Sequence, residues 1–390
     1  MSRELCFSDT WIYYKILCCG IKVIYSLSSG GAERFITDLL NQLAVNEDLD
    51  ITLLLIKSTE LPGNLFYAKE LDSRVKIKSV GMEKITPSVF LKLNKAILQE
   101  KPDVVHVHLS PIILFCIVPL LFYRKPIYIE TLHNEVSRID NSSKIKRFLK
   151  SFVYKFGLAK VCTISDKNAR EYQRVYGRAC DALIYNGRKK LQKTEAFQQV
   201  EDEIRGYKHD DNTLVFVHIA RCAPQKNQKL LIEAFNDFSK DKNVSLIIIG
   251  NQFDSKEGVE LQKQANNKIH FLGEKHNVQD YLFGSDAFVL SSIYEGMPIT
   301  LIEALACGCV PLSTPVSGVV DIVKSRVNGF VSKDFSKAAF IAMLNDYVEH
   351  RAGIDRADLM KLFDEKLSID ACANSYLKFY KKCLNSKKKR

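Results

Sequence analysis

Short apolar runs alternate with longer amphipathic segments along the chain from residue 21 onward. Runs that are apolar at nearly every position are typical of parallel strands buried on both faces. Such runs predict strands at residues 21–27, 51–56, 104–107, 127–131 and 161–165 in the first half, and at 214–219, 245–249, 269–272, 287–290 and 310–313 in the second. Apolar residues at helical spacing lie between these runs. This order predicts an α/β protein with a doubly wound parallel sheet in each half.

The stretch 286–318 contains the clearest unit of strand, loop and helix. Its loop carries Glu295, and Pro298 suits the first turn of the helix, where a missing N–H costs nothing. Glu303 lies eight residues after Glu295, which is roughly 12 Å along a helix. That separation suits two ends of one extended polar ligand, with free N–H groups of the helix N-terminus between them. Because this spacing is common, a second interpretation stays open. In it, Glu303 faces solvent and Glu295 only interacts favourably with the helix dipole.

Basic and imidazole side chains follow other predicted strands. Arg221 and Lys226 come after the first strand of the second half, where they are placed to neutralise a diphosphate. His106, His108 and His133 fall at the ends of strands in the first half. Ligands of open α/β sheets bind beyond the carboxyl ends of strands, so a functional role is open for all three. A structural role is favoured for His106 and His108.

The ordered motif Glu-Gly-Met-Pro, then Glu-Ala-Leu-Ala-Cys-Gly and Val-Pro-Leu-Ser, resembles the signature of a known enzyme family. This is the large family four, or group 1, of retaining, nucleotide-sugar-dependent glycosyltransferases. The Gly-Gly-Ala-Glu loop at residues 30–33 resembles a loop near the start of the same family. The resemblance covers about residues 21–384. It implies the GT-B fold, which consists of two doubly wound Rossmann-like domains facing each other across a cleft.

The resemblance also implies a division of the chain into domains. The expected order is an N-terminal extension at 1–20, an acceptor-side domain at 21–187, a linker at 188–212, a donor-binding domain at 213–367, and a helix at 368–390 that crosses back to the first domain and ends in a basic tail. The family has glycine where this chain has Ala220, so close backbone approach at that position is in doubt.

Roles for individual residues follow from the same resemblance. The implied catalytic residues are His133, Glu295, Arg221 and Lys226. The implied donor-binding residues are Gly30, Gly31, Arg221, Lys226, Gly273, Lys275, Glu295, Gly296, Met297, Pro298, Ile299 and Glu303. Arg221 and Lys226 would hold the diphosphate, Glu303 the ribose, and Glu295 the sugar. The family is generally metal-independent, so we expect no metal and no cofactor besides the nucleotide-diphosphate sugar as co-substrate. The Asp48-Leu49-Asp50 segment is predicted to be a loop at the amino edge of the first sheet.

Composition narrows the class of partner and the compartment. A net charge of +11 and a pI near 9.0 favour an acidic partner, such as a nucleoside diphosphate, an anionic membrane surface or nucleic acid. Eleven cysteines without a Cys-x2-Cys pair predict reduced thiols in the cytoplasm. Residues 1–20 lack the order of a secretion signal, and no apolar run reaches the roughly 20 residues that span a bilayer. We therefore expect a cytoplasmic protein, with peripheral attachment to a membrane open.

Residues 142–160 combine an apolar stripe with basic residues and contain no acidic residue. The apolar residues of the stripe are Ile145, Phe148, Leu149, Phe152, Val153 and Phe156. This pattern predicts a helix that faces anionic lipid through Lys144, Lys146, Arg147 and Lys150, or a domain helix with a solvated basic face.

The preferred function is transfer of a hexosyl or related sugar from a nucleotide-diphosphate sugar to a glycan or lipid-linked acceptor, in cell-surface polysaccharide or glycolipid synthesis. A sugar-nucleotide epimerase of the same fold and a non-catalytic sugar-nucleotide-binding protein are the alternatives. A nicotinamide-dependent oxidoreductase is disfavoured because residues 28–34 lack the Gly-x-Gly-x-x-Gly spacing. Nucleic-acid binding is disfavoured because the phenylalanines of 148–156 lie on the apolar side of their helix rather than on an exposed platform.

Overall fold

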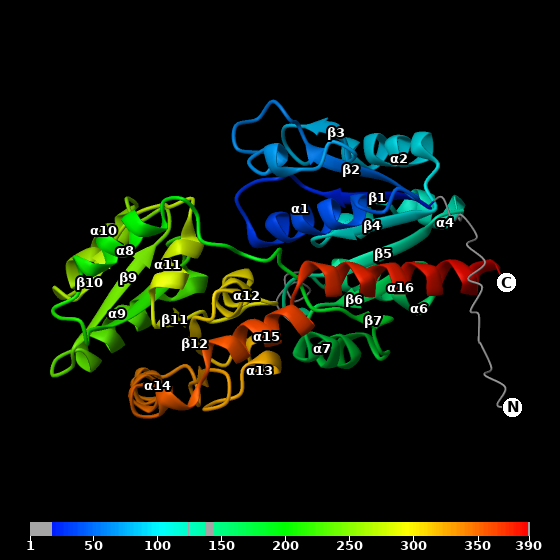
Figure 1. The fold of residues 1–390 in the computed structure, drawn as a ribbon. Helices are drawn as coiled ribbons and strands as arrows, with labels where there is room; N and C mark the ends of the chain where they lie inside the picture. The colour runs from blue at the N-terminus through cyan, green and yellow to red at the C-terminus, as the bar shows by residue number, and fades with distance from the viewer. Residues whose placement is uncertain (1–17, 124, 137–142, 389–390) are drawn as a thin grey trace, which may run out of the picture.

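The computed structural model describes residues 18–123, 125–136 and 143–388, and contains two parallel α/β domains (Figure 1). The first sheet has the strand order β3-β2-β1-β4-β5-β6-β7. Its strands are β1 (Cys18–Ile24), β2 (Leu49–Lys57), β3 (Lys76–Met82), β4 (Val104–His108), β5 (Ile127–Leu132), β6 (Lys160–Thr163) and β7 (Ala182–Leu183). Every neighbouring pair is parallel. The first strand begins at Cys18, within the segment predicted as an N-terminal extension.

The second sheet has the order β10-β9-β8-β11-β12-β13, again with parallel pairs only. Its strands are β8 (Leu214–Ile219), β9 (Val244–Ile249), β10 (Ile269–Phe271), β11 (Ala287–Leu290), β12 (Val310–Ser313) and β13 (Phe330–Val331). In both sheets the strand order reverses beside the first strand, between β1 and β4 and between β8 and β11. Loops that leave the carboxyl ends of these strands are where an open α/β sheet binds ligands.

Helices pack against both sheets. Their apolar residues recur at helical spacing and so form one face that is buried against the sheet. Those of the first domain are α1 (Gly31–Ala44), α2 (Ser88–Glu100), α3 (Ile112–Phe115), α4 (Ile117–Phe122), α6 (Lys144–Lys155) and α7 (Asp166–Tyr176). Those that follow are α8 (Phe197–Arg205), α9 (Gln228–Phe238), α10 (Lys256–Gln264), α11 (Val278–Gly284), α12 (Ile299–Ala306), α13 (Val319–Ile322), α14 (Lys337–His350), α15 (Arg356–Lys366) and α16 (Ile369–Lys388). Helix α8, in the segment predicted as a linker, buries Val200 and Ile204 in the core of the second domain.

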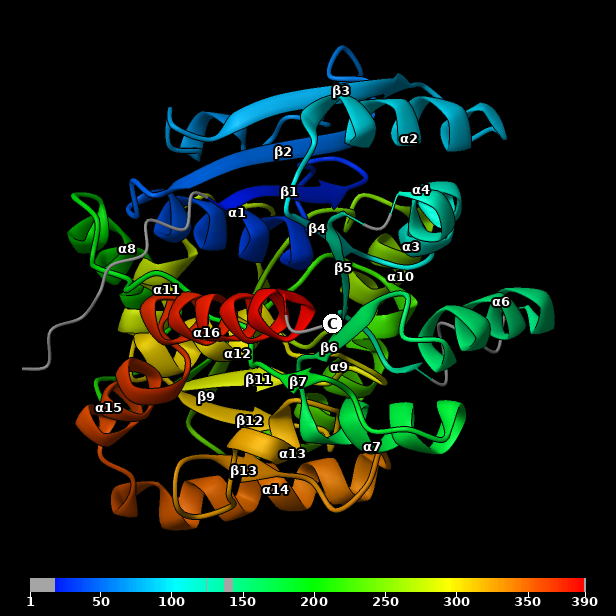
Figure 2. The same cartoon turned by 90° about the vertical axis from the view of Figure 1, so that its right-hand side faces the viewer.

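The chain passes between the domains twice, and the two passages lie side by side. The N–H of Arg188 donates to the carbonyl of Leu367 at 2.9 Å, and the N–H of Ile369 donates to the carbonyl of Arg188 at 2.9 Å. Gly187 makes this approach possible, because a Cβ there would lie 2.7 Å from the carbonyl oxygen of Ser368. Beyond this point α16 runs along the first domain beside α1, with Tyr376 in the core (Figures 1 and 2).

Helix α6 corrects one prediction about the membrane-facing residues. Lys150 is fully buried, with its Nζ 3.3 Å from Oε1 of Glu130, which is itself fully buried on β5. Lys150 is therefore not a surface residue, because it shares the inward face of the helix with Val153 and Tyr154. The remaining apolar residues of the stripe face outward, and Ile145 and Phe148 are each 72% exposed.

Candidate functional site

Loops from both domains meet where the carboxyl ends of the central strands face each other. His133, just after β5, presses its carbonyl oxygen against Gly296 in the β11–α12 loop, and no Cβ at Gly296 would fit. Ile299, the first residue of α12, packs against the cores of both domains and lies beside Gly31 at the start of α1. Four residues predicted for the site from three separate segments are thus brought together: Gly31, His133, and the nearby pair Gly296 and Ile299.

Lys226 and Glu295 form a pair at the carboxyl ends of neighbouring strands β8 and β11. Lys226 Nζ lies 2.7 Å from Glu295 Oε1, and the Ser292 hydroxyl donates to the same oxygen at 2.7 Å. The Ser291 hydroxyl donates to the Lys226 carbonyl at 2.8 Å, which ties the two loops together. Glu295 is only 7% exposed, so the Lys226 ammonium is held over a buried carboxylate in a fixed place. Ser291 and Ser292 carried no signal in the sequence that would have assigned them to the site.

Arg221 follows β8 on the same edge and is exposed. Of the residues that the structure describes, none forms a salt bridge with the Arg221 side chain. Across the junction, the Glu33 carboxylate lies over Gly30, the residue before α1. Burial raises the pKa of Glu33, and the charge of Arg221 counteracts part of that rise. The Arg221 guanidinium is therefore close enough to Glu33 of the first domain to affect its pKa. Its exposed side chain can bind an anion.

Glu303, within α12, is buried and bonded to Arg188, a residue that the sequence does not assign to the site. Arg188 Nε donates to Glu303 Oε1 at 2.7 Å. The same guanidinium donates to Asp38 of α1. Arg188 was expected to begin a polar linker, and nothing in the sequence around it indicated these two partners.

The three histidines form one buried cluster in the first domain. His108 Nδ1 lies 2.9 Å from His133 Nε2, and the rings of His106 and His108 have centroids 4.1 Å apart. His106 also contacts Lys22 and Thr131, each at 2.7 Å. Burial lowers the pKa of His133 to about 4, and burial also lowers the pKa of His108 well below its usual range. At neutral pH His133 is therefore an uncharged imidazole that can donate or accept one hydrogen bond.

Gly273 and Lys275 lie at the end of β10 and contact other residues of the second domain. The Gly273 carbonyl accepts from the N–H of Gly250 at 2.8 Å, and Lys275 Nζ lies 3.3 Å from Glu203 Oε1 in α8. Tyr281 donates to the other oxygen of Glu203 at 2.5 Å. Their contacts therefore connect this loop with α8, and their predicted part in donor binding stays a prediction.

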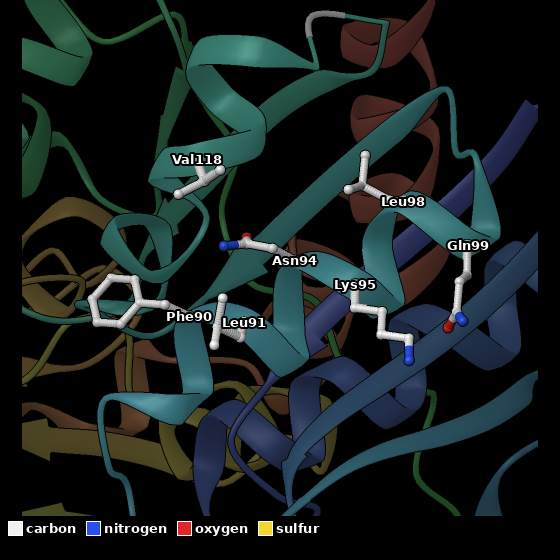
Figure 3. Close-up of a pocket in the computed structure, with 7 residues that line it drawn as sticks. All are labelled: Phe90, Leu91, Asn94, Lys95, Leu98, Gln99 and Val118. Carbon is white, nitrogen blue, oxygen red and sulfur yellow. The ribbon is translucent and has the colours of Figure 1, made fainter.

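A separate groove of about 490 Å³ lies on the first domain between α2 and α4 (Figure 3). It is lined by Phe90, Leu91, Asn94, Lys95, Leu98, Gln99 and Val118, none of which belongs to the junction site. Within the described ranges, no group of three or more His, Cys, Asp or Glu side chains is arranged to hold a metal ion. The same ranges contain no helix long and apolar enough to cross a membrane.

Two family models match the chain in tandem. Glycosyltransferase Family 4 matches residues 29–188, and Glycosyl transferases group 1 matches residues 199–361. The two matches correspond to the two domains and include the junction residues of each. The protein is therefore a two-domain glycosyltransferase, and it belongs to the group 1 glycosyltransferases of family four.

Curated relatives of similar length support this assignment. The UDP-Gal:alpha-D-GlcNAc-diphosphoundecaprenol alpha-1,3-galactosyltransferase of Escherichia coli is 24% identical over 308 residues, which cover 74% of this chain and 78% of the relative. A Campylobacter jejuni enzyme named GalNAc-alpha-(1->4)-GalNAc-alpha-(1->3)-diNAcBac-PP-undecaprenol alpha-1,4-N-acetyl-D-galactosaminyltransferase is 26% identical over 321 residues, which cover 79% of this chain and 83% of the relative.

Solved structures share the fold. HepE from Anabaena in complex with UDP-glucose aligns with a TM-score of 0.76 at 16% identity, over 95% of this chain and 100% of that one. Sucrose-phosphate synthase from Thermosynechococcus elongatus aligns with a TM-score of 0.75 at 13% identity, over 95% and 100%. The predicted fold class, two Rossmann-like domains of the GT-B type, is confirmed.

Proposed function

We propose that the protein transfers a hexosyl or related sugar from a nucleoside-diphosphate sugar to a lipid-linked or glycan acceptor in polysaccharide or glycolipid synthesis, with retention of anomeric configuration. The observation that carries this proposal is the salt bridge between partly buried Lys226 and buried Glu295 beside exposed Arg221, with the carbonyl of His133 from the other domain packed against the adjacent Gly296. Two cations at the carboxyl ends of parallel strands suit a diphosphate leaving group, whose developing charge is the largest electrostatic demand of glycosyl transfer.

Each residue then has a distinct task. Arg221 binds the diphosphate as a fork and Lys226 as a point charge. Glu303 accepts hydrogen bonds from the ribose, and Glu295 with the N–H groups of Gly296, Met297 and Ile299 holds the sugar. His133, a neutral imidazole, hydrogen-bonds the sugar from the first domain. We propose that this chemistry proceeds without a metal ion.

The relatives with undecaprenol-linked substrates suggest an acceptor at a membrane. We propose that α6 attaches the protein reversibly to the cytoplasmic face. Helices α2, α4 and α6 lie on the same side of the first domain (Figure 2), and each carries strongly exposed apolar side chains, which supports this proposal. The most exposed are Leu91, Phe122, Ile145 and Phe148, at 78, 84, 72 and 72%. An amphipathic helix with an outward apolar face and basic flanks binds anionic bilayers in this way.

Two measurements test the proposed function. A panel of nucleotide sugars is screened by thermal shift, because a ligand that binds the native state raises its melting temperature. The donor found is then incubated with and without lipid-linked acceptors, and free nucleoside diphosphate is measured. Release that requires an acceptor supports transfer. Release or sugar interconversion without an acceptor, or binding without any turnover, contradicts it.

We expect Glu303 and Glu295 to act on different parts of the donor. Glu303→Ala should weaken binding of the free nucleoside diphosphate by about tenfold, because a charge-assisted hydrogen bond contributes about 1.5–3 kcal/mol. Glu295→Ala should instead impair use of the intact donor. Calorimetry with both ligands measures this, and exposed Glu260→Ala on α10 is the control. Equal losses of nucleotide affinity in the two variants would show that the division is wrong.

His133→Ala should lower turnover by at least about tenfold, since one hydrogen bond to the reacting sugar is worth about 1.4 kcal/mol. Because burial lowers the pKa of His133 to about 4, its charge does not change between pH 5.5 and 8. The wild-type rate should therefore show no inflection near pH 6.5 from this residue.

Activity of the wild type should persist in excess chelator, because the proposed mechanism uses no metal ion. A loss of activity in chelator that divalent metal restores would contradict the metal-free mechanism.

A further inference from the structure

Arg188 joins a carboxylate of each domain through one guanidinium group. Its Nε donates to Glu303 Oε1 of α12 at 2.7 Å, and its Nη1 donates to Asp38 Oδ2 of α1. All three side chains are nearly inaccessible, at 5% exposed for Arg188, 6% for Glu303 and 4% for Asp38. Burial opposes the charged guanidinium, but Glu303 and Asp38 outweigh it and raise the pKa of Arg188. The group is thus a permanent cation between two carboxylates.

The main chain fixes Arg188 as firmly as its side chain does. Its N–H and carbonyl pair with Leu367 and Ile369 at 2.9 Å each, where the two passages between the domains lie side by side. Asp38 is held in turn, since the N–H of Lys189 donates to its Oδ2 at 3.3 Å. A planar fork with both ends bonded and its backbone paired has little freedom to rotate. Arg188 therefore sets the orientation of the Glu303 carboxylate.

The second oxygen of Glu303 is left for another donor. Within the described ranges, no side chain or backbone N–H donates a hydrogen bond to Glu303 Oε2. A carboxylate with one oxygen held by a guanidinium presents the other in a defined direction. Such an oxygen can accept hydrogen bonds from hydroxyl groups, and a ribose offers two neighbouring ones.

We propose that Arg188 is a positioning residue for the donor, which aims Glu303 at the ribose hydroxyls and makes ribose recognition depend on the junction with the first domain through Asp38. This inference rests on the proposed function of Glu303. Arg188 lies outside the segment 295–303 that contains Glu295 and Glu303. The part of the donor that it affects is the ribose. A residue that only fastened the domains together would affect all nucleotides alike.

The experiment compares affinity for uridine diphosphate and for its 2′-deoxy analogue by calorimetry. We expect the wild type to bind the ribonucleotide at least about tenfold more tightly, in line with one charge-assisted hydrogen bond. In Arg188→Gln this ratio should fall to within about twofold, chiefly by loss of ribonucleotide affinity. Asp38→Asn, which leaves Arg188 bonded to Glu303, should give an intermediate ratio. Arg205→Gln, a change at an exposed arginine of α8, should keep the wild-type ratio.

The outcomes separate this inference from the proposed function. If Arg188→Gln keeps the wild-type ratio while Glu303→Ala loses it, Arg188 is not a positioning residue and the inference is overturned. If the wild type itself does not distinguish the two nucleotides, the proposed ribose role of Glu303 is wrong. The positioning role of Arg188 is then wrong as well. Should Arg188→Gln fail to fold, Arg188→Lys, which retains charge but not the fork, decides the question. It should lower the ratio, and an unchanged ratio overturns the inference.

Discussion

Lys226→Ala and Arg221→Ala should each lower turnover by at least about tenfold, which corresponds to about 1.4 kcal/mol of lost transition-state stabilisation. The two cations meet the charge that develops on the leaving diphosphate, so their loss affects the transition state more than the bound donor. Lys226→Ala should have the larger effect. It also leaves the buried Glu295 carboxylate with Ser292 as its remaining hydrogen-bond partner among the residues described, and an unpaired buried charge is costly.

The double variant should lose about a hundredfold if the two effects add, and less if the residues act as one unit. Steady-state kinetics measure turnover, and circular dichroism verifies that the variants fold. Lys229→Ala is the matched control, because that lysine is the second residue of α9 and its side chain is 70% exposed. A folded double variant with wild-type turnover would remove both residues from the leaving-group site.

Reversing the exposed basic residues of α6 should abolish binding to anionic membranes. Each basic residue near such a surface contributes about 1 kcal/mol, so losing Lys144, Lys146 and Arg147 weakens binding by about 3 kcal/mol, or roughly a hundredfold. Replacement of all three by Glu adds repulsion. Lys150 is left unchanged because it is buried against Glu130. Phe148→Ala should weaken binding further through lost apolar contact.

Sedimentation with vesicles of anionic and of neutral lipid, at low and high salt, measures this attachment, since salt screens the surface charge. The control variant reverses Lys378, Lys381 and Lys382, three exposed lysines of α16. It should still sediment, and the α6 variant should still bind nucleotide. If the wild type stays in solution with anionic vesicles at low salt, α6 is a solvated domain helix and the membrane proposal fails.

The central strands could be predicted from sequence because burial on both faces leaves an unbroken apolar run. Strands β8, β11 and β12 coincide with their predicted ranges. The sequence does not predict strand β3, because it lies at the edge of the first sheet, where Ile77 between Lys76 and Lys78 is 38% exposed and Ser79 follows. A sequence of that kind is typical of an edge strand and carries little apolar signal.

The site was predictable where its residues are close in the chain. Glu295 and Glu303 belong to one motif, and Lys226 follows the first strand of its domain. Arg188 was not predictable, because its partners lie 115 and 150 residues away and the bonds form only when the domains meet. Lys150 was assigned to the wrong face for a related reason. It belongs to a basic run, and its buried partner Glu130 comes from a strand that the helix pattern does not reveal.

The two paired passages between the domains also determine how the molecule can move. Because Arg188 is bonded to residues 367–369, twisting or sliding of one domain against the other at this point would break that pairing. The contact between His133 and Gly296, which lie in different domains, therefore depends in part on a short stretch of paired backbone that is distant from both residues in the sequence.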